Sequence, residues 1–501
     1  MQLIINGERV EVAAGASVAA AVMAAGAATR QSVEGAARGP LCGMGICFEC
    51  RVTINGVAHQ RSCQIAAAPG MEVATGGGPE PAVGAGASAV RDGGECDLLV
   101  LGGGPAGMAG AARAAEAGLR VALVDDNPSL GGQIWRRAQE GAAAAWAARV
   151  RAAGVRVLTG TRIVDQPAGH MLRAEAADGM VDLRYRRLLL ATGARERFLP
   201  FPGWTLPHVL GAGGLQAMAK AGVPMEGKRV LVAGAGPLLL AVAAYVRQHG
   251  ADLVAICEQA PASALAAFAA ATPMSKWREG LRLGRILRGV PVWTGSWIRE
   301  AYPGGVVVRR GGRERRVACD WAGCGFHLVP NIELAQLLGC GTQNGCVLVD
   351  ERQRTTVADV YCAGEPTGVG GVELALIEGE IAGLAAAGRE PAGHELATRA
   401  RYRRFAAKLD AVCRLRPELR GLARADTLVC RCEDVSYARM APYTRWRDAK
   451  LQTRCGMGPC QGRVCGAAAE FLFGWQPEAV RPPIFPASVA ALGAGGVQSK
   501  A

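Results

Sequence analysis

The sequence has 501 residues, half of them apolar, which is too long for one compact core and predicts several domains. The formal net charge of +13 comes mainly from arginines spread along the chain, without an aromatic-interleaved or Gly-rich basic repeat, so we expect a solvated or protein-docking surface and no nucleic-acid binding. The first residues lack a basic segment followed by an apolar run, and no clean apolar stretch of about 18 residues occurs, so we expect a cytoplasmic protein that meets a membrane only through a partner.

The first 76 residues predict short hairpins wrapped around one helix. Asn6-Gly7 and Asn55-Gly56 each separate two apolar runs, and this dipeptide is typical of tight hairpin turns. Ser17 is placed to cap an Ala-rich helix between the two hairpins. We therefore expect a β-grasp domain over residues 1–76, followed by a Gly/Ala/Pro-rich linker over 77–95.

Nine of the 17 cysteines fall into two tight groups, which indicates metal binding rather than a disulfide scaffold. The first group has the spacing C-x4-C-x2-C, with a fourth cysteine further on, as in plant-type [2Fe–2S] ferredoxins. Gly43 and Gly45 would let the loop wrap closely around a cluster. Zinc or two disulfides is the alternative, although zinc sites prefer two separated C-x2-C pairs. The predicted ligands are Cys42, Cys47, Cys50 and Cys63.

A strand, a glycine turn, a helix and a second strand follow from Asp97 onward. Gly102-x-Gly104-x-x-Gly107 lies at that turn: the first glycine permits the bend, the second lets a pyrophosphate approach, and the third lets helix and strand pack closely. Asp125 ends the next strand, where a carboxylate can accept hydrogen bonds from ribose hydroxyls. This pattern is typical of a dinucleotide site, but its signal is weak without the later segments.

Three later segments extend that site. Gly132-Gln133 follows the ribose acid, Thr192-Gly193 ends a strand in a small-residue turn, and Gly364-Glu365 ends another strand with an acid suited to a ribityl chain. Together the segments resemble the two-dinucleotide-binding-domain flavoproteins typified by thioredoxin and glutathione reductases. The resemblance implies FAD in a doubly wound α/β domain over residues 96–225 and 315–390. A nucleotide with only a structural role is the alternative.

A second lobe, over residues 226–314, repeats the pattern imperfectly. Gly234-x-Gly236 is followed by Leu239, where a third Gly or Ala is usual, although Glu258 stands at the ribose-acid position. We expect a degenerate lobe kept for packing, with NAD binding as the alternative. Neither lobe carries a C-x2-C or C-x4-C pair beside the nucleotide motifs, which argues against disulfide reductase chemistry.

The second cysteine group lies in a small domain over residues 427–485, after a helical connector over 391–426 and before a tail over 486–501. It resembles the bacterioferritin-associated-ferredoxin-like [2Fe–2S] domain, a C-x-C pair followed by a second pair on a Gly-rich turn that opens a helix. Five thiols compete for four positions, and zinc is again the alternative. The resemblance implies Cys430, Cys432, Cys460 and Cys465 as ligands, with Cys455 as the alternate.

The whole chain resembles the α subunit of heteromeric amine-oxidising dehydrogenases, here fused to its small [2Fe–2S] ferredoxin subunit. These are hydrogen cyanide synthases, octopine and nopaline oxidases, D-hydroxyproline dehydrogenases and, more distantly, heterotetrameric sarcosine oxidases. Besides the closing cysteine domain, the specific markers are residues 191–194 leading to PFPGWTLP at 200–207, and Gly325-Phe326 leading to Pro330-Asn331.

The resemblance implies a relay subunit without catalytic residues of its own, in a hetero-oligomer. An amine oxidase-type flavoprotein β subunit would oxidise a secondary amine or amino acid, and electrons would pass through FMN at the subunit interface and two [2Fe–2S] clusters to a quinone or another carrier. Some relatives hold NAD or ATP instead of FAD in the first nucleotide turn. The fused ferredoxin departs from the usual separate subunit and leaves the partner open.

Two other functions fit the same motifs. One is a stand-alone NAD(P)H-dependent flavin/iron–sulfur reductase, and the other is a non-catalytic redox-sensing module. Opines, hydroxyproline, sarcosine and glycine are all compatible substrates for the leading interpretation, because their binding residues would lie in the partner subunit.

Overall fold

The computed structural model describes residues 1–76, 90–137, 140–477, 480–487 and 492. The chain forms two compact units, and each is built from three separate stretches of sequence. The first unit comprises Met1–Ala82, Glu196–Leu328 and Lys408–Glu478, and the second comprises Val83–Arg195, Val329–Ala407 and Ala479–Ala501.

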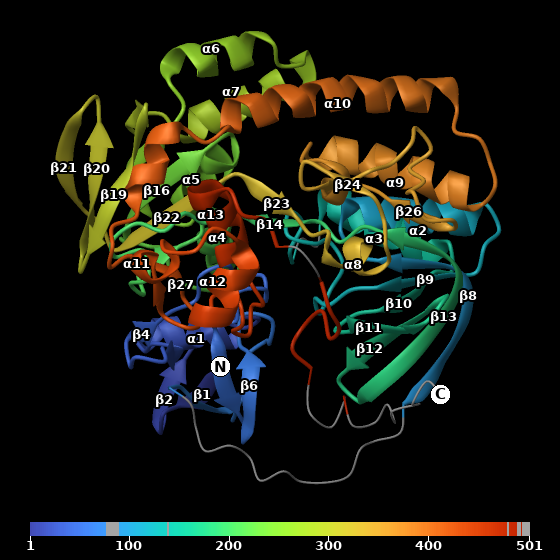
Figure 1. Ribbon diagram of the computed structural model, residues 1–501, viewed down its shortest axis with the longest axis horizontal. Helices are drawn as coiled ribbons and strands as arrows, with labels where there is room; N and C mark the ends of the chain where they lie inside the picture. The colour runs from blue at the N-terminus through green and yellow to red at the C-terminus, as the bar shows by residue number, and fades with distance from the viewer. Residues whose placement is uncertain (77–89, 138–139, 478–479, 488–491, 493–501) are drawn as a thin grey trace. The chain divides into compact units, whose positions relative to one another are not determined.

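The first unit begins with a five-stranded sheet in the order β2-β1-β7-β5-β6 and one helix, which confirms the expected β-grasp pattern (Figure 1). Asn6 and Asn55 have φ values of 52° and 48°, so both Asn-Gly turns take the left-handed conformation that tight hairpins need. Ser17 caps the helix by accepting a hydrogen bond from the backbone N–H of Ala20 at 3.1 Å. The elements are β1 (Gln2–Ile5), β2 (Glu8–Glu11), α1 (Val18–Ala24), β3 (Arg30–Gln31), β4 (Ala37–Arg38), β5 (Arg51–Ile54), β6 (Val57–Arg61) and β7 (Glu72–Ala74).

The second nucleotide lobe also belongs to the first unit. Its parallel sheet has the order β15-β22-β16-β17-β18, and an antiparallel sheet β19-β20-β21 is attached. The apolar strand residues, such as Val230 and Val232, pack against α4 and α5. The elements are β15 (Val209–Leu210), α4 (Ala212–Lys220), β16 (Arg229–Ala235), α5 (Leu238–Gln248), β17 (Asp252–Glu258), α6 (Ala262–Ala270), α7 (Met274–Ile286), β18 (Val292–Thr294), β19 (Ser296–Tyr302), β20 (Gly305–Arg310), β21 (Arg313–Ala318) and β22 (Trp321–Phe326).

The borders of this lobe differ from the sequence expectation. β22 falls in the stretch 315–390 that we expected in the FAD-type domain, yet it pairs in parallel with β16. β15, expected in 96–225, pairs with β22. Short apolar strands fit either of two parallel sheets, so periodicity alone could not assign them. At the other border, β8 begins at Arg91, inside the expected linker, and the rest of that linker, 77–89, lies outside the described residues, as does most of the expected tail.

The small C-terminal domain completes the first unit. Its short antiparallel strands lead into three helices, and the last helix begins at a cysteine. The elements are the 3-10 helix η2 (Pro417–Leu422), β27 (Leu428–Cys430), β28 (Val435–Ser436), α11 (Tyr437–Met440), α12 (Trp446–Thr453) and α13 (Cys465–Phe473).

The second unit contains a seven-stranded sheet with the path β10-β9-β8-β13-β12-β11, and β26 also pairs with β13. The central strands are parallel, as in doubly wound nucleotide-binding domains, whereas β11, β12 and β13 form an antiparallel meander. The strands are β8 (Arg91–Leu101), β9 (Val121–Val124), β10 (Arg156–Leu158), β11 (Arg162–Ala168), β12 (Met171–Ala176), β13 (Gly179–Leu190), β24 (Thr342–Gln343), β25 (Cys346–Val347) and β26 (Val360–Cys362), with the separate pair β14 (Ala194–Glu196) and β23 (Leu328–Pro330). The helices are α2 (Pro105–Glu116), α3 (Gly141–Ala152), α8 (Glu333–Leu337), the 3-10 helix η1 (Glu365–Thr367), α9 (Val372–Ala386) and α10 (Gly393–Cys413), the last of which ends in the first unit.

Helices α2 and α9 cross at backbone contact, because glycines line both sides of the crossing (Figure 1). A Cβ atom at Gly379 of α9 would lie 2.2 Å from the carbonyl oxygen of Ala106, and one at Gly383 would lie 2.4 Å from that of Gly110. This close packing holds the start of α2 at the edge of the sheet, where a nucleotide would bind. Within the described residues, no helix is both long and apolar enough to cross a bilayer.

We expect Gly379→Ala to lower the free energy of unfolding of the second unit by about 1–3 kcal/mol, the usual cost of overpacking. The added methyl group meets backbone, which cannot rotate away as a side chain can. Thermal unfolding of the purified chain measures the effect. Gly393→Ala is the matched control, because a Cβ atom there meets nothing within 4 Å. Equal melting temperatures for the two variants would contradict the packing account.

Candidate functional site

The first cysteine group lies in the loop between β4 and β5 and just after β6. Its four thiols, those of Cys42, Cys47, Cys50 and Cys63, are all buried, with exposed fractions of 3% or less. The Sγ atom of Cys42 accepts hydrogen bonds from the backbone N–H groups of Met44 and Cys47, each at 3.4 Å. Such N–H groups stabilise thiolate ligands in iron–sulfur proteins.

The electrostatics of this loop favour a thiolate. Burial alone would raise the pKa of Cys42, but hydrogen bonds from Cys47 and from the loop backbone outweigh it and lower the pKa to about 6. Gly43 and Gly45 have φ values of 62° and 76°, and this left-handed backbone aims the N–H groups at the sulfur. The four residues expected from the spacing are therefore buried thiols of one loop region, and their chemistry fits a [2Fe–2S] cluster.

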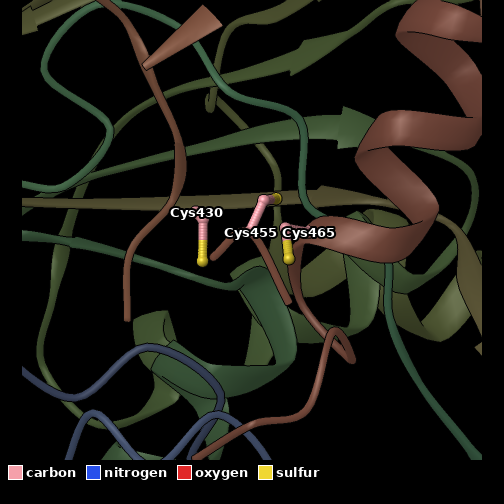
Figure 2. Close-up of side chains that lie close together, drawn as sticks. All are labelled: Cys430, Cys455 and Cys465. Atoms are coloured by element: carbon pink, nitrogen blue, oxygen red, sulfur yellow. The ribbon is translucent and has the colours of Figure 1, made fainter. Parts of the chain in front are cut away.

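The second cysteine group brings five thiols together in the C-terminal domain. The Sγ atoms of Cys430, Cys455 and Cys465 lie within 4.8 Å of one another (Figure 2). The Sγ atom of Cys432 lies 3.5 Å from that of Cys460, and none of the five forms a disulfide. Cys455 is therefore part of the cluster of thiols, although the sequence suggested only an alternate role for it.

Hydrogen bonds with Cys430 oppose the ionisation of two of these thiols. The pKa of Cys455 is raised mainly by its hydrogen bond with Cys430, and a hydrogen bond with the same residue is the main cause that raises the pKa of Cys432 to about 12. Several thiolates crowded in a buried site need a cation, and a metal ion is the usual one. The arrangement thus fits a metal or an iron–sulfur cluster held by four of the five sulfurs.

In the second unit, the glycine fingerprint forms a tight turn at the start of α2. A Cβ atom at Gly102 would lie 2.2 Å from the carbonyl oxygen of Ala191, and one at Gly107 would lie 1.7 Å from that of Gly102. Among the described residues, a Cβ atom at Gly104 would have one neighbour within 4 Å, the Cα atom of Gly132 at 3.9 Å. The first and third glycines are thus required by packing, and the second leaves an open side where a pyrophosphate can approach the N-terminus of α2.

Of the two predicted acids of this site, Asp125 is buried and Glu365 is half-buried with one buried carboxylate oxygen. Asp125 accepts hydrogen bonds from the backbone N–H groups of Gly103 at 2.5 Å and Asn127 at 2.6 Å, which places it on the glycine turn. Burial raises the pKa of Glu365 to about 7, and its buried Oε2 atom has no hydrogen-bond partner. An unpartnered buried oxygen is costly, and a hydroxyl donor of a bound flavin would satisfy it.

The other predicted residues occupy turns of the same unit. The hydroxyl of Thr192 donates to the carbonyl oxygen of Asn331 at 2.6 Å, Gly193 has φ of 68°, and the side chain of Gln133 accepts from Arg136. Sequence reasoning missed one supporting group. Glu378 of α9, fully buried, accepts from the N–H of Gly364 at 3.0 Å.

Arg403 of α10 neutralises Glu378, since its Nε atom donates to Oε1 of that carboxylate at 2.6 Å. The pair fixes the turn at Gly364, which precedes Glu365 and its unpartnered Oε2 atom. Glu378 and Arg403 lie 25 residues apart on different helices, so no local pattern signals their pairing.

The second nucleotide turn is covered by the chain itself. A Cβ atom at Gly236 would lie 2.4 Å from the Sγ atom of Cys413, at the end of α10. Leu409 and Val412 of α10 pack against Ala235 at the end of β16 and Ala260 just after β17. Glu258, at the ribose-acid position, accepts from the N–H of Gly236 at 2.7 Å. The space that a pyrophosphate would need beside this turn is thus filled by protein, a cause that the sequence, with its Leu239, did not reveal.

Comparisons with known proteins identify a family for the nucleotide-binding body and another for the N-terminal domain. Residues 96–387 match the family described as pyridine nucleotide-disulphide oxidoreductase, and residues 1–78 match a 2Fe-2S iron-sulfur cluster binding domain. An opine oxidase subunit from Rhizobium meliloti is 33% identical over 424 residues, which is 74% of this chain and 90% of that protein. Hydrogen cyanide synthase subunit HcnB from Pseudomonas aeruginosa is 31% identical, over 73% of this chain and 90% of that protein.

Among solved structures, L-proline dehydrogenase from P. horikoshii superposes with a TM-score of 0.71 at 18% identity, over 98% of this chain and 97% of that one, which establishes a shared fold. The family match spans most of the chain and includes the FAD-type glycine turn, while the separate match at the N-terminus carries the four buried thiols of the first cysteine group. The chain therefore belongs to the pyridine nucleotide-disulphide oxidoreductase family, as an FAD oxidoreductase with an N-terminal [2Fe–2S] domain that is related to subunits of opine oxidase and hydrogen cyanide synthase.

Proposed function

We propose that this chain is the electron-transfer subunit of a heteromeric dehydrogenase whose partner, an amine oxidase-type flavoprotein, oxidises a secondary amine or amino acid. The proposal depends on one observation: the chain has two groups of buried cysteines and also an FAD-type site. A flavin takes up two electrons and releases them singly, and each [2Fe–2S] cluster carries one, so the set suits a relay. The relatives are themselves named as subunits, which supports a hetero-oligomer.

We assign the cofactors to the residues described above. Gly102, Gly104 and Gly107 would hold the pyrophosphate of FAD, Asp125 its ribose, and Glu365 its ribityl chain, with Gly132, Gln133, Thr192, Gly193 and Gly364 shaping the turns around it. NAD or ATP at this turn is the alternative. Cys42, Cys47, Cys50 and Cys63 would hold the first cluster. Cys430, Cys432, Cys460 and Cys465 would hold the second, with Cys455 as the alternate. FMN would lie where the partner protein docks.

The glycine turn of the second nucleotide lobe is covered by the end of α10, which argues against a stand-alone NAD(P)H reductase. Such an enzyme needs an open site for the nicotinamide dinucleotide, and Cys413 lies where that dinucleotide would approach Gly236. Gln259 reinforces the cover, because its side chain donates to the carbonyl oxygen of Arg414 at 2.9 Å and accepts from the N–H of Arg416 at 3.0 Å. Electrons would therefore enter from a partner rather than from NAD(P)H.

The purified chain, loaded with its cofactors, is expected to reduce dyes from octopine, sarcosine, hydroxyproline or glycine only at background rates. Co-expression with its flavoprotein partner should raise the rate by about tenfold or more, because the amine must be positioned in the partner's site. Anaerobic addition of NADH should leave the flavin absorbance unchanged. Turnover of an amine by the chain alone, or rapid bleaching by NADH, would contradict the proposal.

The ligand set of the second cluster can be tested by counting iron. We expect Cys430→Ser to lose about half of the iron and acid-labile sulfide, since one of two [2Fe–2S] clusters is disrupted. Cys455→Ser should retain the full content, as should the control Cys96→Ser, which changes a buried cysteine in β8. Loss of iron in Cys455→Ser would place Cys455 among the ligands, and full retention in Cys430→Ser would remove Cys430 from them.

A further inference from the structure

A buried ion pair joins the two cysteine groups of the first unit. Glu49 lies in the segment between Cys47 and Cys50, and Arg431 lies between Cys430 and Cys432. The Nη2 atom of Arg431 is 3.3 Å from the Oε2 atom of Glu49, and both side chains are 1% exposed. The ligand loop of one group therefore contacts the ligand loop of the other, although the two residues are 382 positions apart in the chain.

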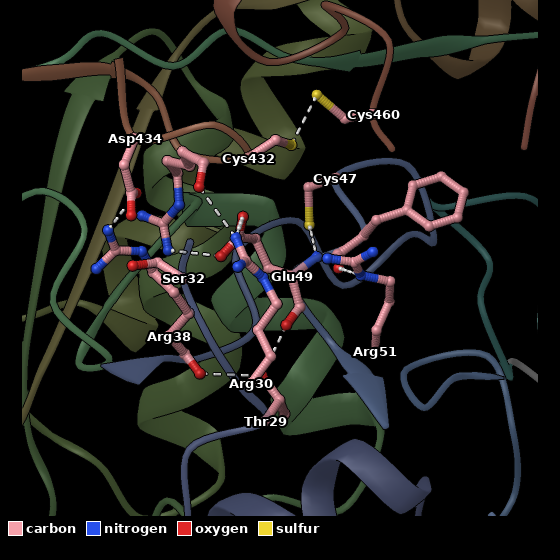
Figure 3. Close-up of polar contacts among 12 residues, drawn as sticks. Thr29, Arg30, Ser32, Arg38, Cys47, Glu49, Arg51, Cys432, Asp434 and Cys460 are labelled. Atoms are coloured by element: carbon pink, nitrogen blue, oxygen red, sulfur yellow. Dashed lines mark hydrogen bonds and ion pairs between the residues drawn. The ribbon is translucent and has the colours of Figure 1, made fainter. Parts of the chain in front are cut away.

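Arg30 turns this pair into a triad. Its Nη2 atom donates to Oε1 of Glu49 at 2.8 Å and to the backbone carbonyl oxygen of Arg431 at 3.0 Å (Figure 3). The hydroxyl of Thr29 donates to the carbonyl oxygen of Glu49 at 2.7 Å. Trp204 holds Arg431 from the other side, since its carbonyl oxygen accepts from Nη1 at 2.9 Å. Both loops are thus fixed through side chain and backbone.

Stability alone does not explain this triad. Three buried charges lose their hydration, and well-packed apolar residues would join two domains at no greater cost. What the triad adds is a fixed geometry and a charge: two arginines and one glutamate are net positive. Clusters held by four thiolates are net anionic, so the triad would lie between two anions and favour their close approach.

The surroundings of the triad exclude water. Cys42 and Cys47 belong to the same apolar core as the five C-terminal cysteines, together with Leu41, Phe48 and Trp204. In such a core charges act over longer distances than in water, because screening is weak. A charge at the triad would therefore act on both groups.

We propose that Arg30, Glu49 and Arg431 form an electron-transfer joint, by which we mean a contact that fixes the two cluster-binding loops next to each other. In this arrangement electrons would pass directly between the clusters inside this chain. The inference rests on the proposed function, because it requires an iron–sulfur cluster at each of the two cysteine groups. With both clusters bound, each exchange would move one electron, so that one cluster would be oxidised as the other is reduced, without transfer of an atom or proton. The three residues are positioning residues, because the contact of Glu49 with Arg431 joins the two loops.

A second ion pair of the same domains provides a matched control. The Nη2 atom of Arg38 lies 2.8 Å from Oδ1 of Asp434, and both side chains are at least 96% buried. Asp434 also accepts from the backbone N–H of Glu34 at 3.1 Å. This pair joins the two domains but lies outside the segments between the cysteines, and its charges cancel.

The first test uses the unmodified full-length chain, prepared anaerobically and reduced stepwise. Iron and sulfide analysis establishes whether both clusters are present, and electron paramagnetic resonance then records each reduction level. We expect the fully reduced spectrum to be split or broadened by magnetic interaction, so that it differs from the sum of two isolated clusters. A simple sum with both clusters present would overturn the joint while leaving the relay intact. A single cluster would overturn both.

The second test measures the reduction potentials of both clusters in variants. Glu49→Gln removes a negative charge and should raise both potentials, whereas Arg431→Met removes a positive charge and should lower both. The double control Arg38→Gln with Asp434→Asn should shift neither. A purely structural role would give shifts without this opposite sign, and a shift of one cluster alone, or none, would overturn the joint. If either variant fails to fold, the spectra of the unmodified chain still decide.

Discussion

Buried thiols are the constraint on which the first unit depends. Cys42, Cys47 and all five C-terminal cysteines lie in one apolar core, where an unpaired thiolate is expensive and a crowd of them is untenable without a cation. The sequence meets this constraint with N–H groups aimed at sulfur, with glycine turns that let the loops wrap closely, and with arginines between the two groups. The fold of this unit packs its two groups of buried cysteines around one core.

The second nucleotide lobe has a dinucleotide-binding fold whose glycine turn is covered by protein. Its parallel sheet and glycine turn persist, yet the end of α10 covers the turn, and Gly214 and Gly43 let α4 pack directly on the first cysteine loop. Trp204 of the same lobe holds Arg431 of the C-terminal domain. A lobe that binds a dinucleotide in other folds of this type serves here as the scaffold between the two thiol groups.

Local patterns predicted much of this structure. The Asn-Gly hairpins, the Gly102 turn and the cysteine spacings each depend on a few neighbouring residues, so the sequence alone shows them. The features that it did not show depend on residues far apart in the chain. Examples are the contacts of Cys413 with Gly236, of Arg403 with Glu378 and of Arg431 with Glu49. Each forms only when distant parts of the chain come together in the fold. The expectation that β22 belongs to the FAD-type domain was wrong for the same reason, because the sequence of a short apolar strand does not show which strand it pairs with.

With its proposed cofactors bound, this one chain would store electrons in a flavin and in two iron–sulfur clusters. An anaerobic titration of the purified chain with dithionite, followed by absorbance, measures this capacity directly. The account predicts an end point at about four electrons per chain, two for the flavin and one for each [2Fe–2S] cluster. An end point at about two electrons would contradict it.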